Sequence, residues 1–217
     1  MLNSANTNPF HTFTMIRGDI SDKFVELIEE ATNGDDTELI SLINNDSELA
    51  NNLTQQDCDL TGGRKLCSKS DSTLLMVGLT PLDFHGNRIR ASNDSNVRER
   101  LGRYPWGDGN PLSYLRTWSG NPPNSEEDIM ILIDKLDDGL SEEKRGHDRF
   151  ENSSFGTLHG ILNDKETKKL ERLLSSGLFK VRADEPLDGG VADIMRHLKI
   201  IVRMAAKNNL GILHYSH

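Results

Sequence analysis

The first fifty residues show apolar side chains at helical spacing. In SDKFVELIEEATNG, residues 21–34, apolar positions recur three and four residues apart between charged ones, which predicts an amphipathic helix. Ser21 is expected to cap the start of this helix and Gly34 to end it. A second, short helix is expected after Asp35, because Glu38 follows at the spacing of a capping box. Two helices so close in sequence predict a helical hairpin.

Three further helices are predicted in the C-terminal part. The first opens with Ser125 and the acidic residues after it, which favour a helix N-terminus. The second covers residues 163–176 and begins with the capping pair Asn163 and Glu166. The third covers residues 188–208, and its broad apolar stripe predicts the core helix of this part.

The remaining segments carry weaker patterns. The apolar run at 74–79 fits either a buried strand or a buried helix, and we favour the helix. Residues 179–183 alternate between apolar and polar types, which is compatible with a short strand that has no evident pairing partner. Residues 54–72 are polar and contain a Gly-Gly pair, which predicts a long loop. The Asn/Thr-rich residues 1–15 are interpreted as a poorly ordered arm.

These patterns predict a mainly α-helical protein that forms a single compact unit. Its expected parts are a flexible arm at 1–15, a helical part at 16–83, an irregular connector at 84–123 and a three-helix part at 124–217. One minor strand is compatible with this architecture.

Composition narrows the function classes. The chain has 217 residues and a formal charge of −9, which argues against general nucleic-acid binding. No apolar run reaches the length of a membrane-spanning helix, and the first residues lack the pattern of a signal peptide. We therefore expect a cytoplasmic protein without membrane contact, while export by another route stays open. Cys58 and Cys67, nine positions apart, could form a disulfide but are too few for a metal cluster or a disulfide scaffold, and reduced thiols are the favoured interpretation. No metal and no cofactor are expected.

One part of the chain resembles a known family. The stretch GDDTELISLINNDSELAN, followed by STLLMVGL and by TPLD at 80–83, is similar to ankyrin-type helical repeats over roughly residues 34–83. Asp83 stands where these repeats have His, the spacing carries an insertion, and no second copy follows at a 33-residue period. The resemblance implies a surface for binding other proteins.

Aromatic and arginine residues gather in the connector. Residues 84–123 hold six arginines, both tryptophans and only three acidic residues, within an acidic chain. Three interpretations stay open: a docking loop for a partner protein, which we favour, packing over the helices, and a site for an anionic or nucleotide-like ligand. The leading hypothesis is a protein-interaction or regulatory module that docks through residues 98–118. Its expected anchors are Arg100, Arg103, Tyr104, Trp106, Arg116 and Trp118.

The rival hypothesis is a small transferase or hydrolase for a phosphorylated or nucleotide-like substrate. Arg100, Arg103 and Arg116 would hold the anion, and the candidates for the chemistry are Cys67, His85 and Asp108. No catalytic residue is assigned by a motif. Cys67 is a better nucleophile candidate than Cys58, because acidic neighbours at positions 57 and 59 disfavour a Cys58 thiolate.

The histidines and serines in the C-terminal part give weaker signals. Ser153 and Ser154 lie near His159 but lack the Gly-x-Ser-x-Gly context of a serine nucleophile, so a loop is the better interpretation. His214 and His217 are three residues apart, a spacing that suits a shared metal ion, but they lie at the end of the chain without an evident third ligand. We interpret them as a solvated tail.

Overall fold

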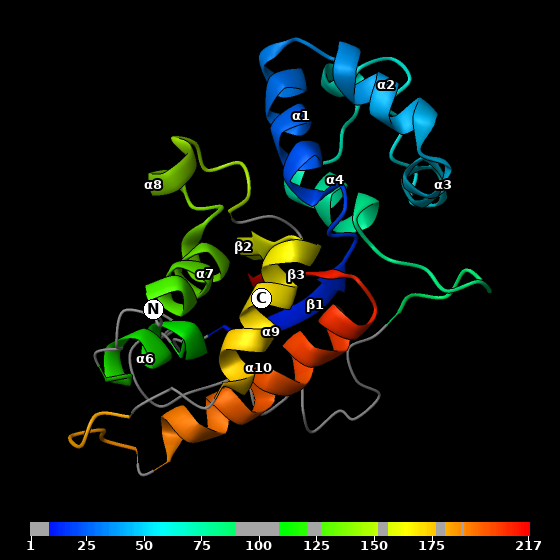
Figure 1. Ribbon diagram of the computed structural model, residues 1–217. Coiled ribbons are helices and arrows are strands. Elements are labelled where there is room, and N and C mark those ends of the chain that lie inside the picture. Colours follow the sequence, from blue (N-terminus) through cyan, green and yellow to red (C-terminus); the bar gives the residue numbers. More distant parts are fainter. Residues whose placement is uncertain (1–8, 90–108, 121–126, 152–155, 177–180, 188) are drawn as a thin grey trace, which may run out of the picture.

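The protein is mainly helical, with a small antiparallel sheet of three strands. The computed structural model describes residues 9–89, 109–120, 127–151, 156–176, 181–187 and 189–217. In Figure 1 the sheet lies at the centre, with helices α1 to α4 on one side and helices α6, α7, α9 and α10 on the other. This arrangement agrees with the predicted helical class and adds a sheet layer between two helical layers.

The elements follow the chain in a simple order. The strands are β1 (His11–Ile16), β2 (Thr157–Leu162) and β3 (Gly211–Ser216). The helices are α1 (Ser21–Asn33), α2 (Thr37–Asn45), α3 (Ser47–Gln55), α4 (Asp71–Gly78), α6 (Pro111–Trp118), α7 (Glu127–Asp138), α8 (Glu142–Arg145), α9 (Asp164–Ser175) and α10 (Gly190–Lys207), and a 3-10 turn, η1, covers Arg64–Leu66.

The sheet joins segments that are far apart in sequence. Its order is β1-β3-β2, so the C-terminal strand β3 is central and pairs antiparallel with both neighbours. His11 pairs with Ser216 at one end of the β1–β3 ladder, and Ile16 pairs with Gly211 at the other. The expected flexible arm at 1–15 is therefore wrong for residues 11–15, which form a strand, while residues 1–8 lie outside the described residues.

One face of the sheet packs on the N-terminal helices. Ile16 and Leu213 point into this layer, where they meet fully buried side chains such as Phe24 on α1. The ion pair between Arg17 and Asp46 fastens the end of β1 to the start of α3. Burial of these apolar side chains is the main force that holds the N-terminal helices to the sheet.

The opposite face packs on the C-terminal helices. Phe13 and Met15 on β1 and Ile212 on β3 contact a core formed mainly by α6, α7, α9 and α10. Leu198, on the apolar stripe of α10, is fully buried there. The prediction that the last helix is the core helix of this part is confirmed.

Local helix signals are mostly confirmed. Asn163 and Glu166 form the predicted capping box of α9, and Gly34 ends α1 in the left-handed conformation, at φ 115°. The run at 74–79 belongs to helix α4, as favoured. Ser21 is the first helical residue rather than the cap, and its hydroxyl donates to the carbonyl oxygen of Gly18.

Among the described helices, α3, α6 and the four-residue α8 lie where none was expected. Helix α3 begins at the N-cap Asp46, whose carboxylate accepts a hydrogen bond from the Leu49 amide. Helix α6 interrupts the connector that we predicted as irregular, and Asn110 caps it directly before Pro111. Pro111 suits the first turn of a helix because that position needs no amide donor. The expected strand at 179–183 is limited to one isolated bridge between Val181 and Ser119 within the described residues.

Among the helices that the structure describes, none combines the length and the apolar character needed to cross a bilayer.

Candidate metal centre

Three histidines meet on one face of the sheet. His11 comes from β1, His159 from β2 and His214 from β3, so each strand contributes one imidazole. Alternate residues of a strand share a face, and His11 and His214 therefore lie on the same face as Phe13. We call these three residues the histidine cluster.

A bulge in β2 places the third histidine. Leu158 pairs with Tyr215 and Gly160 pairs with His214, so His159 is an extra residue in the ladder. An extra residue interrupts the alternation of side chains between the two faces. As a result, the His159 ring stacks on the ring of His214, with centroids 4.6 Å apart.

The imidazole nitrogens of the cluster lie close together. His11 Nδ1 is 2.9 Å from His214 Nε2. One nitrogen from each of the three rings can be chosen so that all three lie within 4.8 Å of one another. One imidazole nitrogen from each strand therefore lies in a single small region.

The C-terminal end of α7 fixes the orientation of His214. Its Nδ1 is 3.1 Å from the carbonyl oxygen of Leu136. A carbonyl oxygen only accepts, so Nδ1 carries the hydrogen and Nε2 presents its lone pair to the cluster. The Phe13 ring stacks on the imidazole, with centroids 4.5 Å apart and planes 8° apart.

His214 stays neutral at physiological pH. Its pKa lies well below the usual 6.5, chiefly because burial disfavours the charged ring, and further because His159 and His11 would repel a second positive charge. A neutral imidazole is the form that binds metal ions. His214 Nε2 therefore carries no proton that a metal ion would have to displace.

The cluster reaches the surface on one side. His11 and His214 are buried, whereas His159 is partly exposed. His159 Nε2 lies 2.7 Å from the hydroxyl oxygen of Ser216, a residue that is itself almost fully buried. Ser216 therefore holds the imidazole that faces solvent.

The geometry can be compared with that of a tetrahedral metal site. Zinc–nitrogen bonds of about 2.1 Å put two nitrogens of a tetrahedral site ~3.4 Å apart. This value lies between two distances in the cluster. His11 Nδ1 is 2.9 Å from His214 Nε2, and the limit for the whole cluster is 4.8 Å.

Local sequence patterns do not predict the histidine cluster. We interpreted His214 as part of a solvated tail, which is wrong: it is fully buried in the central strand. His217 follows the end of β3 and is not part of the cluster. The partners of His214 are His11 and His159, which the sheet register brings together, whereas no third ligand was evident from the sequence.

The predicted Arg/Trp docking segment is described only in part. Arg100, Arg103, Tyr104 and Trp106 lie outside the described residues, as does Asp108. The remaining anchors, Arg116 and Trp118, lie on α6 and make contacts within the protein.

Arg116 and Trp118 both have partners on neighbouring segments. Arg116 Nη1 donates to the buried carboxylate of Asp137 at 2.9 Å, and Arg116 Nη2 pairs with Asp134. The guanidinium of Arg182 lies over the Trp118 ring, 5.2 Å from its centroid, which is within reach of a cation–π interaction. These contacts are those of the packing interpretation, which we had kept beside docking.

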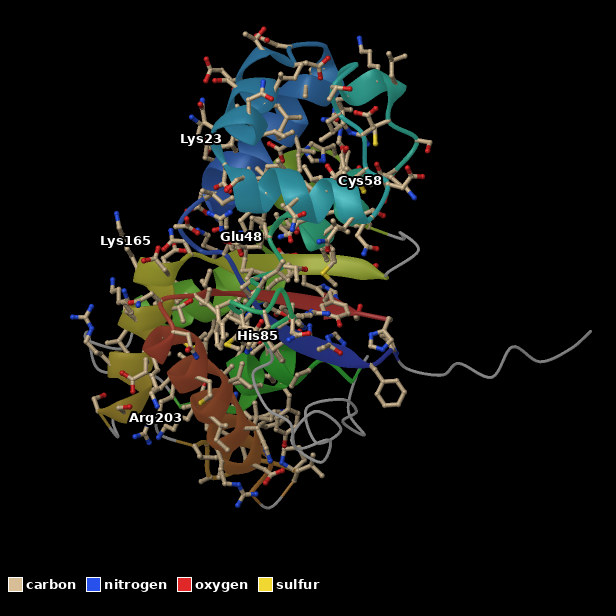
Figure 2. The ribbon with its side chains drawn as sticks, turned by 90° about the vertical axis from the view of Figure 1, so that its right-hand side faces the viewer. Lys23, Glu48, Cys58, His85, Lys165 and Arg203 are labelled. Atoms are coloured by element: carbon tan, nitrogen blue, oxygen red, sulfur yellow. The ribbon has the colours of Figure 1, made fainter. Side chains whose placement is uncertain are left out.

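Cys67 and His85, the described candidates for the chemistry of the enzyme hypothesis, lie in different parts of the fold. Cys67 follows the 3-10 turn η1 and packs against the N-terminal core. His85 lies in an exposed turn after α4, and its ring contacts that of Phe84. In Figure 2, Cys58 lies among the helices above the sheet and His85 lies nearer the level of the strands.

The two cysteines are free thiols. Cys58 is buried, and burial raises its pKa, with smaller contributions from Cys67 and from Asp57. The prediction that Cys58 is the poorer nucleophile agrees with this direction.

Comparison with protein-family models, with curated proteins and with solved structures finds no match to this chain.

Proposed function

We infer that the protein binds a divalent transition-metal ion, with zinc as the expected ion, through His11, His159 and His214. The observation that carries this inference is the convergence of one imidazole from each strand on a region less than 5 Å across. The three imidazoles already lie close together, and a hydrogen bond orients that of His214. Both features support metal binding.

The donor chemistry favours zinc over calcium or magnesium. Imidazole nitrogen suits zinc, copper, nickel and iron, whereas calcium and magnesium prefer oxygen donors. The hydrogen bond from His214 Nδ1 to the Leu136 carbonyl is the kind of outer contact that orients metal-binding histidines. Sets of three imidazoles with one further position are typical of zinc sites that take part in catalysis.

The environment supports an open coordination position. The cluster supplies three protein ligands, and the partly exposed His159 marks the side from which water or a small anion enters. A divalent ion held by neutral ligands keeps its full charge and polarises a bound water or carbonyl group. We therefore favour a hydrolytic or hydration role for the centre over a purely structural one.

The decisive experiment is a metal titration of the complete chain with any affinity tag removed. After treatment with a chelator, the protein should bind one Zn²⁺ per chain by calorimetry, with a dissociation constant on the order of 1 μM or lower. Co²⁺ in the same site should produce the strong visible absorption of a four-coordinate ion. Zn²⁺ should also raise the melting temperature, because it binds the native state.

Ligand variants test which residues bind the ion. Changing His159 to Gln should weaken binding by at least about 100-fold, because changes in outer contacts alone cost about 10- to 100-fold. His159 is the best position for this test because it is partly exposed. Its replacement also keeps the hydrogen bond from His214 to the Leu136 carbonyl oxygen. His11→Gln should have the same effect.

Two controls guard against binding elsewhere. His85→Gln and His217→Gln change histidines outside the cluster and should leave the affinity unchanged. A wild-type protein that fails to bind zinc, copper or nickel would refute the proposal. So would an affinity that falls in the two control variants but not in His159→Gln.

The two functions predicted from sequence stay predictions. Docking of a partner protein through residues 98–118, and binding of a phosphorylated or nucleotide-like substrate by the same arginines, depend mainly on residues outside the described part of the chain. The metal centre is independent of both, because none of its three ligands belongs to that segment.

A further inference from the structure

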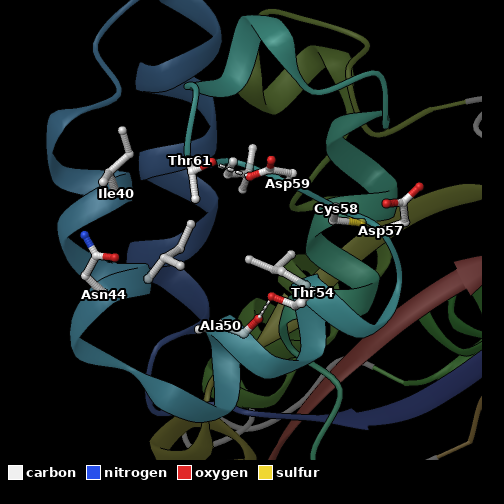
Figure 3. Close-up of a pocket in the computed structure, with 11 residues that line it drawn as sticks. Ile40, Asn44, Ala50, Thr54, Asp57, Cys58, Asp59 and Thr61 are labelled. Atoms are coloured by element: carbon white, nitrogen blue, oxygen red, sulfur yellow. Dashed lines mark hydrogen bonds between the residues drawn. The ribbon is translucent and has the colours of Figure 1, made fainter.

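A second candidate site lies in the N-terminal helical layer. Its residues lie between positions 40 and 61, and none of them belongs to the histidine cluster. A pocket of about 430 Å³ opens between α2, α3 and the loop at 57–61 (Figure 3). Its apolar lining comes from Ile40 and Ile43 on α2, from Leu53 on α3 and from Leu60. A volume of this size suits one or two large side chains of a ligand.

The edge of this pocket is acidic. Asp57 and Asp59, which line it on either side of Cys58, are both exposed. The pKa of Asp59 is lowered because its carboxylate accepts hydrogen bonds from the hydroxyl and the amide of Thr61. Asp59 therefore carries a full negative charge at neutral pH. No lysine or arginine is among the residues that line the pocket.

The negative charge extends beyond the pocket over helices α1 to α3 and the loop that follows them. Residues 21–60 contain eleven of the 34 acidic residues of the chain but only one of its 25 basic residues, Lys23. Some of these carboxylates are neutralised by other layers, as Asp46 is by Arg17 and Glu29 by Arg145.

Six exposed carboxylates of this layer form no ion pair with any described residue. They are Glu26, Glu30, Asp35, Glu38, Asp57 and Asp59. A surface with this excess of one sign attracts cationic partners and repels nucleic acids and anionic membranes. Six negative charges spread over two helices and a loop exceed what a single small amine can neutralise.

We propose that this pocket binds a basic peptide segment of a partner protein, with an apolar side chain of the peptide in the pocket and lysine or arginine side chains against Asp57 and Asp59. The apolar walls supply the free energy of burial, and the carboxylates supply selection by charge. An extended peptide is the occupant that uses both features, since its side chains alternate between the pocket and the surrounding acidic surface.

This site differs from the docking segment predicted from sequence. That segment is rich in arginine and would itself dock through basic side chains, whereas the pocket recognises basic side chains on the partner. It is also independent of the metal centre, because no residue of the histidine cluster lines it.

Selection from a library of random peptides displayed on phage tests the preferred ligand. The complete chain serves as bait in a buffer that contains EDTA, so the result does not depend on a bound metal ion. The enriched peptides should carry lysine or arginine next to a large apolar residue. A fluorescent copy of the most enriched peptide then gives dissociation constants by anisotropy.

Two pairs of substitutions separate the pocket from general charge attraction. The double change Asp57→Asn and Asp59→Asn removes two charges at the pocket and should weaken binding at least about tenfold. The matched control, Glu26→Gln with Glu30→Gln, removes two exposed charges of α1 and should change binding less than about threefold. Ala50→Phe should block binding by filling the pocket, which Ala50 lines.

Each of the following results would overturn the proposal. Enrichment of acidic or uncharged peptides would contradict the charge selection, and so would a bait that enriches no peptide. An equal loss of affinity in the two charge pairs would show that attraction is general and that the pocket plays no part. Unchanged binding by Ala50→Phe, with a melting temperature like that of the wild type, would exclude the pocket as the contact.

Discussion

Gly160 on β2 lies directly against the carbonyl oxygen of Leu136 on α7. A β-carbon on Gly160 would lie 2.5 Å from that oxygen and closer still to the carbonyl oxygen of Lys135. The same Leu136 oxygen accepts the hydrogen bond from His214 Nδ1. The missing side chain at position 160 thus allows α7 to approach the sheet closely enough to orient a residue of the histidine cluster.

Gly160→Ala is expected to push α7 away from the sheet. Such overpacking against backbone atoms costs about 2–3 kcal/mol, the upper part of the usual range, which corresponds to a fall in melting temperature of ~4–12 °C for a chain of this size. Thermal unfolding followed by circular dichroism measures the change. Gly146→Ala is the control: its φ of 74° carries a strain of about 1 kcal/mol, but a β-carbon there meets no atom within 4 Å. Equal losses in the two variants would contradict the proposed close contact.

Ser216 is expected to position His159 for metal binding. Ser216→Ala removes the hydroxyl that lies 2.7 Å from His159 Nε2 and should weaken zinc affinity by about 10-fold. The stoichiometry should stay at one ion per chain, because the three imidazoles remain. Calorimetry measures both quantities. Ser113→Ala, a change on α6 far from the cluster in sequence, serves as the control, and an unchanged affinity in Ser216→Ala would refute the positioning role.

Helices could be predicted here because their signals are local. The capping pair Asn163 and Glu166 and the helix stop Gly34 each act within a few residues, so the sequence pattern and the structure agree there. The strands were missed for the opposite reason. The β1 sequence HTFTMI alternates between buried and partly exposed residues over its first five positions, but its pairing partner begins 200 residues later, at Gly211.

The histidine cluster could not be predicted for the same reason, because its residues are far apart in sequence. His11 and His214 are 203 positions apart, and only the register of β1 against β3 shows that they lie on one face. His159 joins them because of a bulge between Leu158 and Gly160, which no propensity pattern predicts. His11 and Phe13, and likewise Ile212 and His214, are two residues apart. This spacing is typical of strands and does not indicate metal ligands.

Arg116 is expected to stabilise the fold through Asp137. The Asp137 carboxylate is almost fully buried and accepts hydrogen bonds from Arg116 and from Asn110. Arg116→Met removes the cation and should lower the free energy of unfolding by about 1–2 kcal/mol, since the arginine itself is partly exposed. Urea unfolding provides the measurement.

The exposed Arg203 on α10 offers a matched control for this change. Arg203→Met removes the same charge, and it should change the free energy of unfolding by less than about 0.5 kcal/mol. If Arg116→Met is as stable as Arg203→Met, the contact with Asp137 contributes little. Arg116 would then be better explained by the docking role predicted from sequence.

The pairing of Asp46 with Arg17 predicts a loss of stability in acid. The pKa of Asp46 is lowered from 3.8, first because Arg17 donates hydrogen bonds to its carboxylate and further because the Leu49 amide does so. A lowered pKa in the folded state means that the unfolded chain binds more protons. The resulting stability is therefore fully present above about pH 4 and is lost as the pH falls through the folded-state pKa.

Two substitutions separate the charge from the cap at this position. Asp46→Asn keeps a side chain that can cap α3 but removes the charge, so it should cost about 1 kcal/mol at pH 7 and reduce the steepness of the loss below pH 4. Asp46→Ala removes both contributions and should cost about 2 kcal/mol at pH 7. Urea unfolding between pH 3 and pH 7 distinguishes them. If Asp46→Asn keeps the full acid dependence of the wild type, another carboxylate must be responsible for it, because the amide cannot titrate in this range.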